Sequence, residues 1–153
     1  MTQNMNPNRQ EALARREQSL AVVQRFYEAL ATNDGSKVVP LLTEDFVGIV
    51  AEGIPNGLGG VYHGNEHAVA NIWNRLWDLF YAHGEPTEVL SVDDDPDRFV
   101  VLGRYVGETP DGASMGVDAA FAHVITVRGD RLAAFQQITD TAQWQQFRTR
   151  ERD

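Results

Sequence analysis

Hydrophobic and polar residues alternate most clearly between residues 121 and 140. In the first half of this stretch, every second residue belongs to one predicted inward face: Phe121, His123, Ile125 and Val127. That period of two is typical of a β-strand with one side turned toward a core. Arg128-Gly129-Asp130 then has turn chemistry, and a second strand-like run follows over residues 132–139. The pattern predicts a β-hairpin, and two polar residues in its apolar stripes, His123 and Gln137, make it the expected floor of a pocket.

Helical spacing dominates the first half of the chain, where apolar residues recur every three or four positions. Three helices are predicted, over residues 9–32, 36–42 and 65–83. Gly35 can end the first helix in a left-handed conformation, and Ser36 and Asn65 are expected to cap the second and third. A short final helix is expected from Thr141.

Strand-like runs occupy most of the second half. The predicted strands are residues 46–51, 87–92, 98–108, 114–127 and 132–139. Five glycines between Glu52 and Asn65 favour a flexible crossing loop, near the pocket mouth, over a lid that grips a ligand. Helices followed by an antiparallel meander predict an α+β fold, in which the three N-terminal helices cover the apolar face of one twisted sheet.

The length of 153 residues fits one domain, which we place at residues 9–148, between a disordered start at 1–8 and a charged tail at 149–153. Twenty-two acidic residues against 13 Lys and Arg give a net charge of −9, which argues against nucleic-acid or anionic-membrane binding. No apolar run reaches the length of a membrane span, and the start lacks the apolar core of a secretory signal. We therefore expect a cytoplasmic protein.

No metal or cofactor site is expected. The chain has no cysteine, which excludes thiol chemistry and cysteine–metal sites. His63 and His67 are four residues apart but lack an obvious third ligand. The acidic run at residues 93–97 lacks the glycine and the glutamate of a calcium-binding loop, so it is predicted to be a solvated turn.

Two local patterns resemble one known family. The pattern EGxPxGxxGxYxG begins at Glu52, and FxHVxTVxxxxLxxFxxxxDTAxW runs from Phe121 to Trp144. With the order of elements over residues 17–147, they resemble the SnoaL-like branch of the nuclear transport factor 2-like superfamily. The resemblance implies a cone-shaped α+β barrel that encloses one deep apolar pocket, usually within a homodimer packed through the sheets. The superfamily includes isomerases, polyketide cyclases, epoxide hydrolases, dehydratases and non-enzymatic binding modules, so the fold alone names no activity.

The resemblance also directs attention to one histidine and one amide. Polyketide cyclases of this family use an acidic residue on the last strand and a histidine on the preceding strand, and the matching positions here are Gln137 and His123. An imidazole can serve as acid or base near pH 7, although a half-buried histidine bonded to a carbonyl or to Gln137 is the alternative. A carboxamide cannot take a proton, so Gln137 is instead expected to donate a hydrogen bond to developing negative charge.

Asp140 and several aromatic residues complete the candidate site. Asp140 either assists His123 as a partner or base, or it caps the final helix through the N–H group of Ala142 or Gln143. Five aromatic side chains are candidates to line a cavity for a flat hydrophobic ligand, and about two of them are expected to touch it. They are Tyr27, Trp73, Trp77, Tyr105 and Phe121.

The register of the hairpin decides which of these side chains share a face. A two-residue turn, favoured by Gly129, pairs Val127 with Leu132 and puts His123 on the face of Asp140. A three-residue turn with a bulge pairs Val127 with Arg131 and puts His123 and Gln137 on one face, because one residue of slip exchanges the faces. We predict the second arrangement, which agrees with the pairing of histidine and acid in the family.

Two functions follow from these residues. The first is a cofactor-free isomerase, cyclase or hydrolase that acts on a hydrophobic carbonyl or polyketide-like substrate, with His123 as acid or base and Asp140 as its partner. The second is a binding module that sequesters a small apolar molecule unchanged. His123 favours the first function and Gln137 the second.

Overall fold

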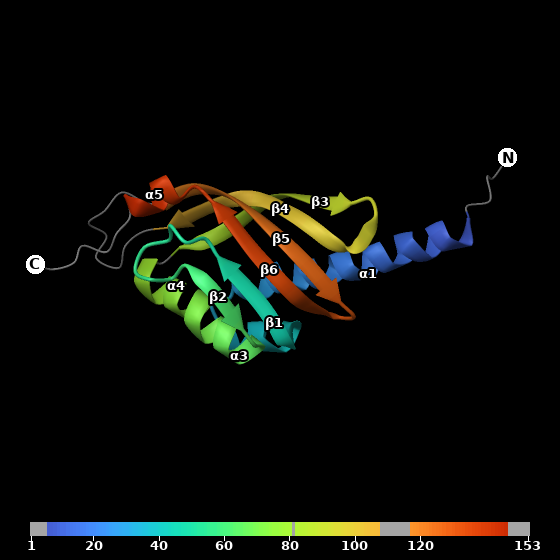
Figure 1. The fold of residues 1–153 in the computed structure, drawn as a ribbon, viewed down its shortest axis with the longest axis horizontal. Coiled ribbons are helices and arrows are strands. Elements are labelled where there is room, and N and C mark those ends of the chain that lie inside the picture. Colours follow the sequence, from blue (N-terminus) through green and yellow to red (C-terminus); the bar gives the residue numbers. More distant parts are fainter. Residues whose placement is uncertain (1–5, 81, 108–116, 147–153) are drawn as a thin grey trace, which may run out of the picture.

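Along the chain, helical segments precede and follow the first two strands, and the next four strands have no helix between them within the described residues (Figure 1). This computed structural model describes residues 6–80, 82–107 and 117–146. The helical segments are α1 (Pro7–Leu30), α2 (Gly35–Val38), η1 (Val39–Leu41), α3 (Asn65–Ala68), η2 (Val69–Trp73), α4 (Asn74–Phe80) and α5 (Thr141–Gln145). The strands are β1 (Leu42–Val50), β2 (Gly60–His63), β3 (His83–Val92), β4 (Asp95–Gly107), β5 (Val117–Arg128) and β6 (Arg131–Thr139). No helix within the described ranges is long and apolar enough to cross a membrane.

The first helix, α1, begins two residues before its predicted start, because Pro7 fits the first helical turn and the Asn6 side chain accepts the Asn8 N–H group at 3.0 Å. After the helix, the left-handed residue is Asn33, with φ 54°, and not the predicted Gly35. Most of the predicted disordered start and the whole charged tail lie outside the described residues. Figure 1 shows that α1 runs behind the sheet and that its first turns project beyond it.

The second helix is shorter than predicted and has a different cap. Asp34, and not Ser36, is the cap: its carboxylate accepts the Ser36 N–H group at 3.0 Å. The α-helix ends at Val38 and continues as the 3₁₀ turn η1, which contains Pro40. Proline has no N–H group to donate to the preceding turn, which explains the early end of the α-helix.

The third predicted helix consists of α3, η2 and α4 in direct succession. It starts after Gly64, which has φ 92° and no side chain to cap it, so the predicted cap by Asn65 is wrong. Its middle turn, η2, is π-helical, and such turns carry one extra residue and recur at functional sites. The helix ends at Phe80, and His83 already belongs to β3, four residues before the predicted strand.

The six strands form one curled, open sheet in the order β2-β1-β6-β5-β4-β3 (Figure 1). Neighbouring strands are antiparallel, except that β1 and β6 are parallel. The short strand β2 lies within the predicted glycine loop, and β1 starts four residues earlier than predicted. The predicted α+β fold is confirmed, and so is the mostly antiparallel sheet.

Helices and sheet meet in an aromatic core. Trp73 of η2 lies at its centre, with its indole 5.6 Å from the Phe26 ring of α1 and 5.4 Å from the Phe135 ring of β6, between centroids. Phe46 of β1 approaches Trp73 from another side, at 6.2 Å. Edge-to-face contacts of this kind add to the stabilisation by burial alone. The packing fixes α1 and η2 against the sheet, and these two elements form one wall of the pocket described below.

The hairpin combines parts of both predicted registers. Its turn has two residues, with a positive φ at Gly129 (67°), and Val127 pairs with Leu132. The predicted Val127–Arg131 pair is therefore wrong. However, Thr126 pairs with Ala134, so β6 contains an extra residue directly after Leu132. This bulge exchanges the faces of the following residues.

Candidate functional site

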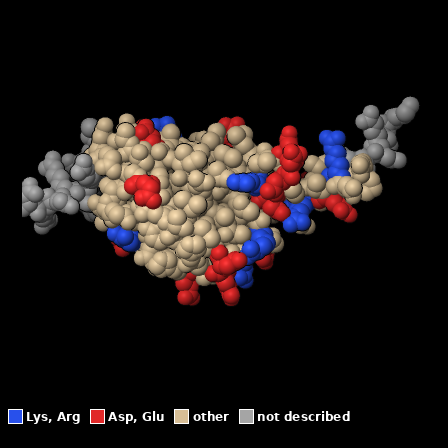
Figure 2. All heavy atoms as spheres, viewed as in Figure 1, with Lys and Arg blue, Asp and Glu red and all other residues tan. Residues whose placement is uncertain are grey.

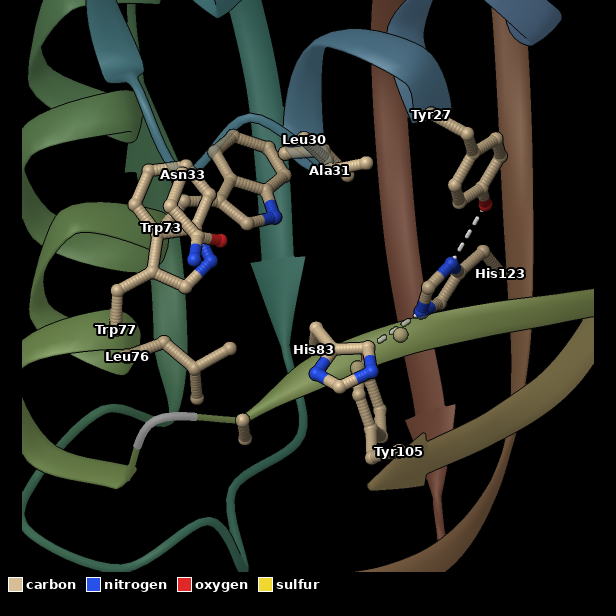
Figure 3. Close-up of a pocket in the computed structure, with 12 residues that line it drawn as sticks. Tyr27, Leu30, Ala31, Asn33, Trp73, Leu76, Trp77, His83, Tyr105 and His123 are labelled. Atoms are coloured by element: carbon tan, nitrogen blue, oxygen red, sulfur yellow. Dashed lines mark hydrogen bonds between the residues drawn. The ribbon is translucent and has the colours of Figure 1, made fainter. Parts of the chain in front are cut away.

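A pocket of about 250 Å³ opens between the end of α1, the helix η2–α4 and strands β3, β4 and β5. Figure 3 shows Trp73 and Trp77 on one side of it and Tyr27 and His123 on the other. Apolar and aromatic side chains dominate its wall. The lining residues are Tyr27, Leu30, Ala31, Asn33, Trp73, Leu76, Trp77, Ala82, His83, Gly84, Tyr105 and His123.

Four of the five predicted aromatic residues line this pocket, and Phe121 does not. Phe121 instead stacks on the His123 imidazole, with ring centroids 3.9 Å apart and planes 7° apart. It also packs against Tyr105, at 4.7 Å. Phe121 therefore holds two lining side chains from behind. It does not line the pocket, because its position on β5 puts it in the core beside its pocket-lining neighbours.

The bulge in β6 places His123 and Gln137 directly opposite each other on one face of the sheet. The prediction that they share a face is confirmed. Both are buried, with 2% and 7% of their surface exposed. His123 lines the pocket and Gln137 lies behind it. Buried polar side chains need hydrogen-bond partners, and each of these two has them.

Both ring nitrogens of His123 have tyrosine partners. Nδ1 lies 2.7 Å from the Tyr27 hydroxyl, and Nε2 lies 2.5 Å from the Tyr105 hydroxyl (Figure 3). Burial lowers the pKa of His123 to about 3, because a low-dielectric surrounding disfavours the imidazolium. His123 is therefore neutral at pH 7 and has one N–H donor and one acceptor nitrogen.

Gln137 fixes the far end of this network. Its Oε1 accepts the Ala51 N–H group of the segment after β1, at 3.2 Å. Because a backbone N–H can only donate, the orientation of the amide is settled, and Nε2 donates to the Tyr105 hydroxyl at 2.8 Å. Gln137 thus donates a hydrogen bond, as predicted, but to Tyr105 rather than into the pocket.

The direction of the protons follows from these contacts. The Tyr105 oxygen accepts from Gln137, and among the described residues its only other hydrogen-bond partner is His123. The Tyr105 proton must therefore go to Nε2 of His123, which leaves the imidazole proton on Nδ1 to be donated to the Tyr27 oxygen. The Tyr27 proton is then free to point into the pocket. Hydrogen bonds that follow one another in this way strengthen each other.

Burial also raises the pKa of both tyrosines, most strongly that of Tyr27, and the nearby Tyr105 adds to the effect there. For Tyr105, the hydrogen bond from Gln137 partly opposes the rise. Both hydroxyls therefore stay protonated at neutral pH. The network presents the pocket with a neutral O–H donor and with no buried group that gains or loses charge near pH 7.

Asp140 does not join this network. It is exposed at the end of β6, where its carboxylate accepts the Gln143 N–H group at 3.4 Å and caps α5. The expected partnership with His123 is not formed, because Asp140 lies three residues after Gln137 and side chains on a strand alternate between faces. The alternative prediction, a helix cap, describes its position.

Two polar lining residues were missed by the sequence analysis, Asn33 and His83. Asn33 directly follows the first predicted helix, and His83 was predicted as the last residue of the third. The available signal was that each lies at the C-terminal end of a predicted helix, where the chain turns toward the next element. Among the described residues, no group of three His, Asp or Glu side chains could hold a metal ion.

A curled sheet around one pocket, covered by a long N-terminal helix, defines a nuclear transport factor 2-like protein. Residues 23–135 match the family model of the SnoaL-like domain, and the chain belongs to that family. A search of curated proteins found no match.

Solved structures agree with this fold. An NTF2-like protein of unknown function from Burkholderia pseudomallei is 27% identical, with a TM-score of 0.70 over 82% of this chain and 92% of that one. TerC, co-crystallised with polyporic acid, is 20% identical, with a TM-score of 0.72 over 84% and 95%. A protein from Catenulispora acidiphila with a ketosteroid isomerase-like fold, in complex with trimethylamine, is 17% identical, with a TM-score of 0.62 over 76% and 83%.

Proposed function

We propose that the chain is a cofactor-free, isomerase-type enzyme that acts on a small hydrophobic carbonyl compound. The observation that carries this proposal is the hydrogen-bond network that ends at Tyr27. Its hydroxyl accepts from His123 at 2.7 Å and has its own proton available to a ligand oxygen. A donor that is already oriented can stabilise the negative charge that develops on a carbonyl oxygen when a neighbouring C–H bond breaks.

The dimensions and lining of the pocket support a ligand of one or two rings. Its volume of about 250 Å³ is slightly below the usual range for sites that hold drug-sized molecules. Trp73 and Trp77 provide flat apolar surfaces opposite Tyr27 (Figure 3). TerC was crystallised with polyporic acid and the Catenulispora protein with trimethylamine, so relatives of this fold are known with organic molecules. The outward O–H donor favours an acceptor such as a carbonyl over an ammonium ion.

A second function, a module that only binds its ligand, is favoured by the neutral network. His123, with its pKa lowered to about 3, cannot accept a proton at pH 7, and the two tyrosines cannot release one. This revises the role expected of His123: in our proposal it orients and polarises Tyr27 and does not itself transfer the proton. Catalysis then needs a different proton-transfer group.

Two small molecules test these functions. 3-Cyclohexen-1-one becomes a conjugated enone when a proton moves from the α to the γ carbon, and the conversion is followed by ultraviolet absorbance. 2-Naphthol offers a bicyclic surface and one oxygen, and its binding is followed by calorimetry. We expect the protein to catalyse the conversion and to bind 2-naphthol much more tightly than trimethylammonium.

Tyr27→Phe is the decisive variant. It should weaken 2-naphthol binding about 3- to 10-fold, the equivalent of one neutral hydrogen bond, and lower kcat about 10²-fold or more. Tyr62→Phe is the matched control, because the Tyr62 hydroxyl donates to the Leu58 carbonyl at 2.7 Å and does not line the pocket. Binding of 2-naphthol without any conversion of the enone would favour the binding module. Equal affinity of Tyr27→Phe and the wild type would contradict the role of Tyr27.

A further inference from the structure

His83 lies at the mouth of the pocket, at the first position of β3. Its Nε2 is 3.1 Å from Oε1 of Glu85, two residues further along the strand. Residues two apart point to the same side of a strand, so the backbone of β3 keeps the two side chains together. A carboxylate can only accept, so Nε2 of the neutral imidazole carries the proton and Nδ1 has a free lone pair.

This histidine differs from every other residue that lines the pocket. The described lining contains no Asp, Glu, Lys or Arg, and its buried imidazole and phenols do not change charge near pH 7. The His83 side chain is 53% exposed, so water can reach it to supply and remove protons. Histidine is the side chain best suited to proton transfer in this pH range.

We propose that His83, oriented by Glu85, is the catalytic acid and base of this pocket. The inference rests on the proposed function and adds the proton-transfer group that the Tyr27 network lacks. Two walls of the pocket then have separate catalytic roles. The donor on α1 stabilises charge on the ligand oxygen, and the imidazole on β3 moves the proton.

A β,γ-unsaturated ketone would be isomerised by two proton transfers at His83. Nδ1 of His83 takes the α proton, and the electrons of that C–H bond form a dienolate whose oxygen accepts the Tyr27 O–H group. The resulting imidazolium is stabilised by the Glu85 carboxylate. Nδ1–H then returns the proton to the γ carbon, the carbonyl forms again, and the double bond lies between the α and β carbons. The imidazole ends neutral, as it began.

The charged groups around this pair lie on the sheet. Glu85 is opposite Arg104 of β4 in the register, and the Arg104 guanidinium forms an ion pair with Asp118 of β5 at 2.6 Å. Tyr105 is the neighbouring titratable residue on β4, and α4 contributes only the uncharged Leu76 and Trp77 to the lining. Glu85 is thus the carboxylate in contact with His83. The pair is exposed, so its charge coupling is modest, and its main effect is orientation.

The test measures proton abstraction and isomerisation in the same variants. Exchange of the α protons of cyclohexanone for deuterium is followed by NMR, and conversion of 3-cyclohexen-1-one by absorbance. His83→Gln retains a donor to Glu85 but has no basic nitrogen. It should lower both rates about 10²- to 10⁴-fold and leave 2-naphthol affinity within about twofold, which also shows that the pocket is folded. His67→Gln, at an exposed histidine that does not line the pocket, should match the wild type.

Two further variants distinguish a base from a structural residue. Added imidazole should restore exchange to His83→Ala and leave the wild type unchanged. Glu85→Ala should lower kcat more than it changes KM, because the imidazole then loses the acceptor that orients it.

Failure of this inference differs from failure of the proposed function. Full activity of His83→Gln, in a wild type that is active, would overturn the role of His83 and leave the isomerase proposal intact. A wild type that binds 2-naphthol but neither exchanges nor isomerises the ketones would overturn both.

Discussion

His123 and Gln137 face each other on neighbouring strands, and the Tyr105 hydroxyl connects their side chains. The amide nitrogen of Gln137 sets the direction of every hydrogen bond from there to Tyr27. A residue that is three hydrogen bonds away from Tyr27 therefore decides whether the Tyr27 hydroxyl offers the pocket a donor or an acceptor. Four predictions follow from this and other relationships.

Reversing the network should weaken ligands that accept hydrogen bonds. In Gln137→Glu, an ionised carboxylate accepts from Tyr105, which then accepts from His123, so that Tyr27 donates to the imidazole and no longer to a ligand. Affinity for cyclohexanone, whose oxygen can only accept, should fall as pH rises through the pKa of the new carboxyl group, which burial raises. Calorimetry from pH 5 to 8 measures this. Gln136→Glu, at an exposed neighbouring position, is the control, and identical pH profiles of the two variants would contradict the assigned direction.

Acid should destabilise the fold through His123. The unfolded imidazole binds a proton below its ordinary pKa of about 6.5, whereas the folded one does so only near a pKa of about 3. Between these values the unfolded state holds more protons, so stability falls as pH falls. From pH 7 to 5 the loss is about 2 kcal/mol in the free energy of unfolding. Urea titrations should show this slope in the wild type and in His67→Gln, and a shallower one in His123→Gln.

Gly103 of β4 should not tolerate a side chain. A Cβ atom built there overlaps the ring of Phe121 and the carbonyl oxygen of Glu85. Gly103→Ala should therefore lower the free energy of unfolding by about 1–3 kcal/mol, the typical result of overpacking. It should also shift Phe121, which stacks on His123, and so weaken 2-naphthol binding. Gly57→Ala meets no neighbouring atom, although its φ of 71° strains a side chain there; it should therefore lower stability without weakening 2-naphthol binding.

The outer face of the sheet should pack against a second copy of the chain. Val61 and Ile138 are 55% and 52% exposed, and Ile49, paired with Val61, is 37% exposed. Figure 2 shows a broad central area of this side without charged residues. Large exposed apolar areas of this kind mark interaction surfaces, and a two-fold dimer would cover both copies. Sedimentation should give a dimer at micromolar concentration.

Ile138→Lys should shift this equilibrium toward monomer. Leu13→Lys, at a similarly accessible leucine on α1, should leave it unchanged. A monomeric wild type would contradict the dimer.

Much of the fold can be read from the spacing of apolar residues, because burial enforces that spacing. The stripe on the first helix supplies Val22, Val23 and Phe26, all buried. Helix ends were predicted less well. Asp34 and Ser36 have equal capping chemistry, and only the backbone path decides between them. The apolar residues after Trp77 continue to the start of β3 without a glycine or proline, so nothing in the pattern separates His83 from the helix.

Within the site, the shared face of His123 and Gln137 and the donor role of Gln137 were predicted, but the neutral state of the His123 imidazole was not. Burial and two tyrosine partners determine the pKa of His123, and both depend on residues far away in the sequence. Tyr27 was predicted as an apolar wall with a polar handle, and the network makes that handle the important group. The bulge in β6 has no glycine or other local signal, so its position could not be predicted either.

Because of the bulge in β6, the number of residues in this strand matters more to the pocket than the identity of the residues at the bulge. With the two-residue turn alone, Gln137 would lie on the outer face of the sheet, and the extra residue after Leu132 puts it on the face of His123. Substitutions there change a single small side chain. Deleting Ala133 would remove that extra residue, so that Leu132 and Phe135 alternate regularly and Gln137 stays opposite His123. With the bulge retained, deleting Gln136 would instead turn Gln137 to the outer surface and bring Ile138 opposite His123, a larger disturbance of the pocket than most replacements of a residue that lines it.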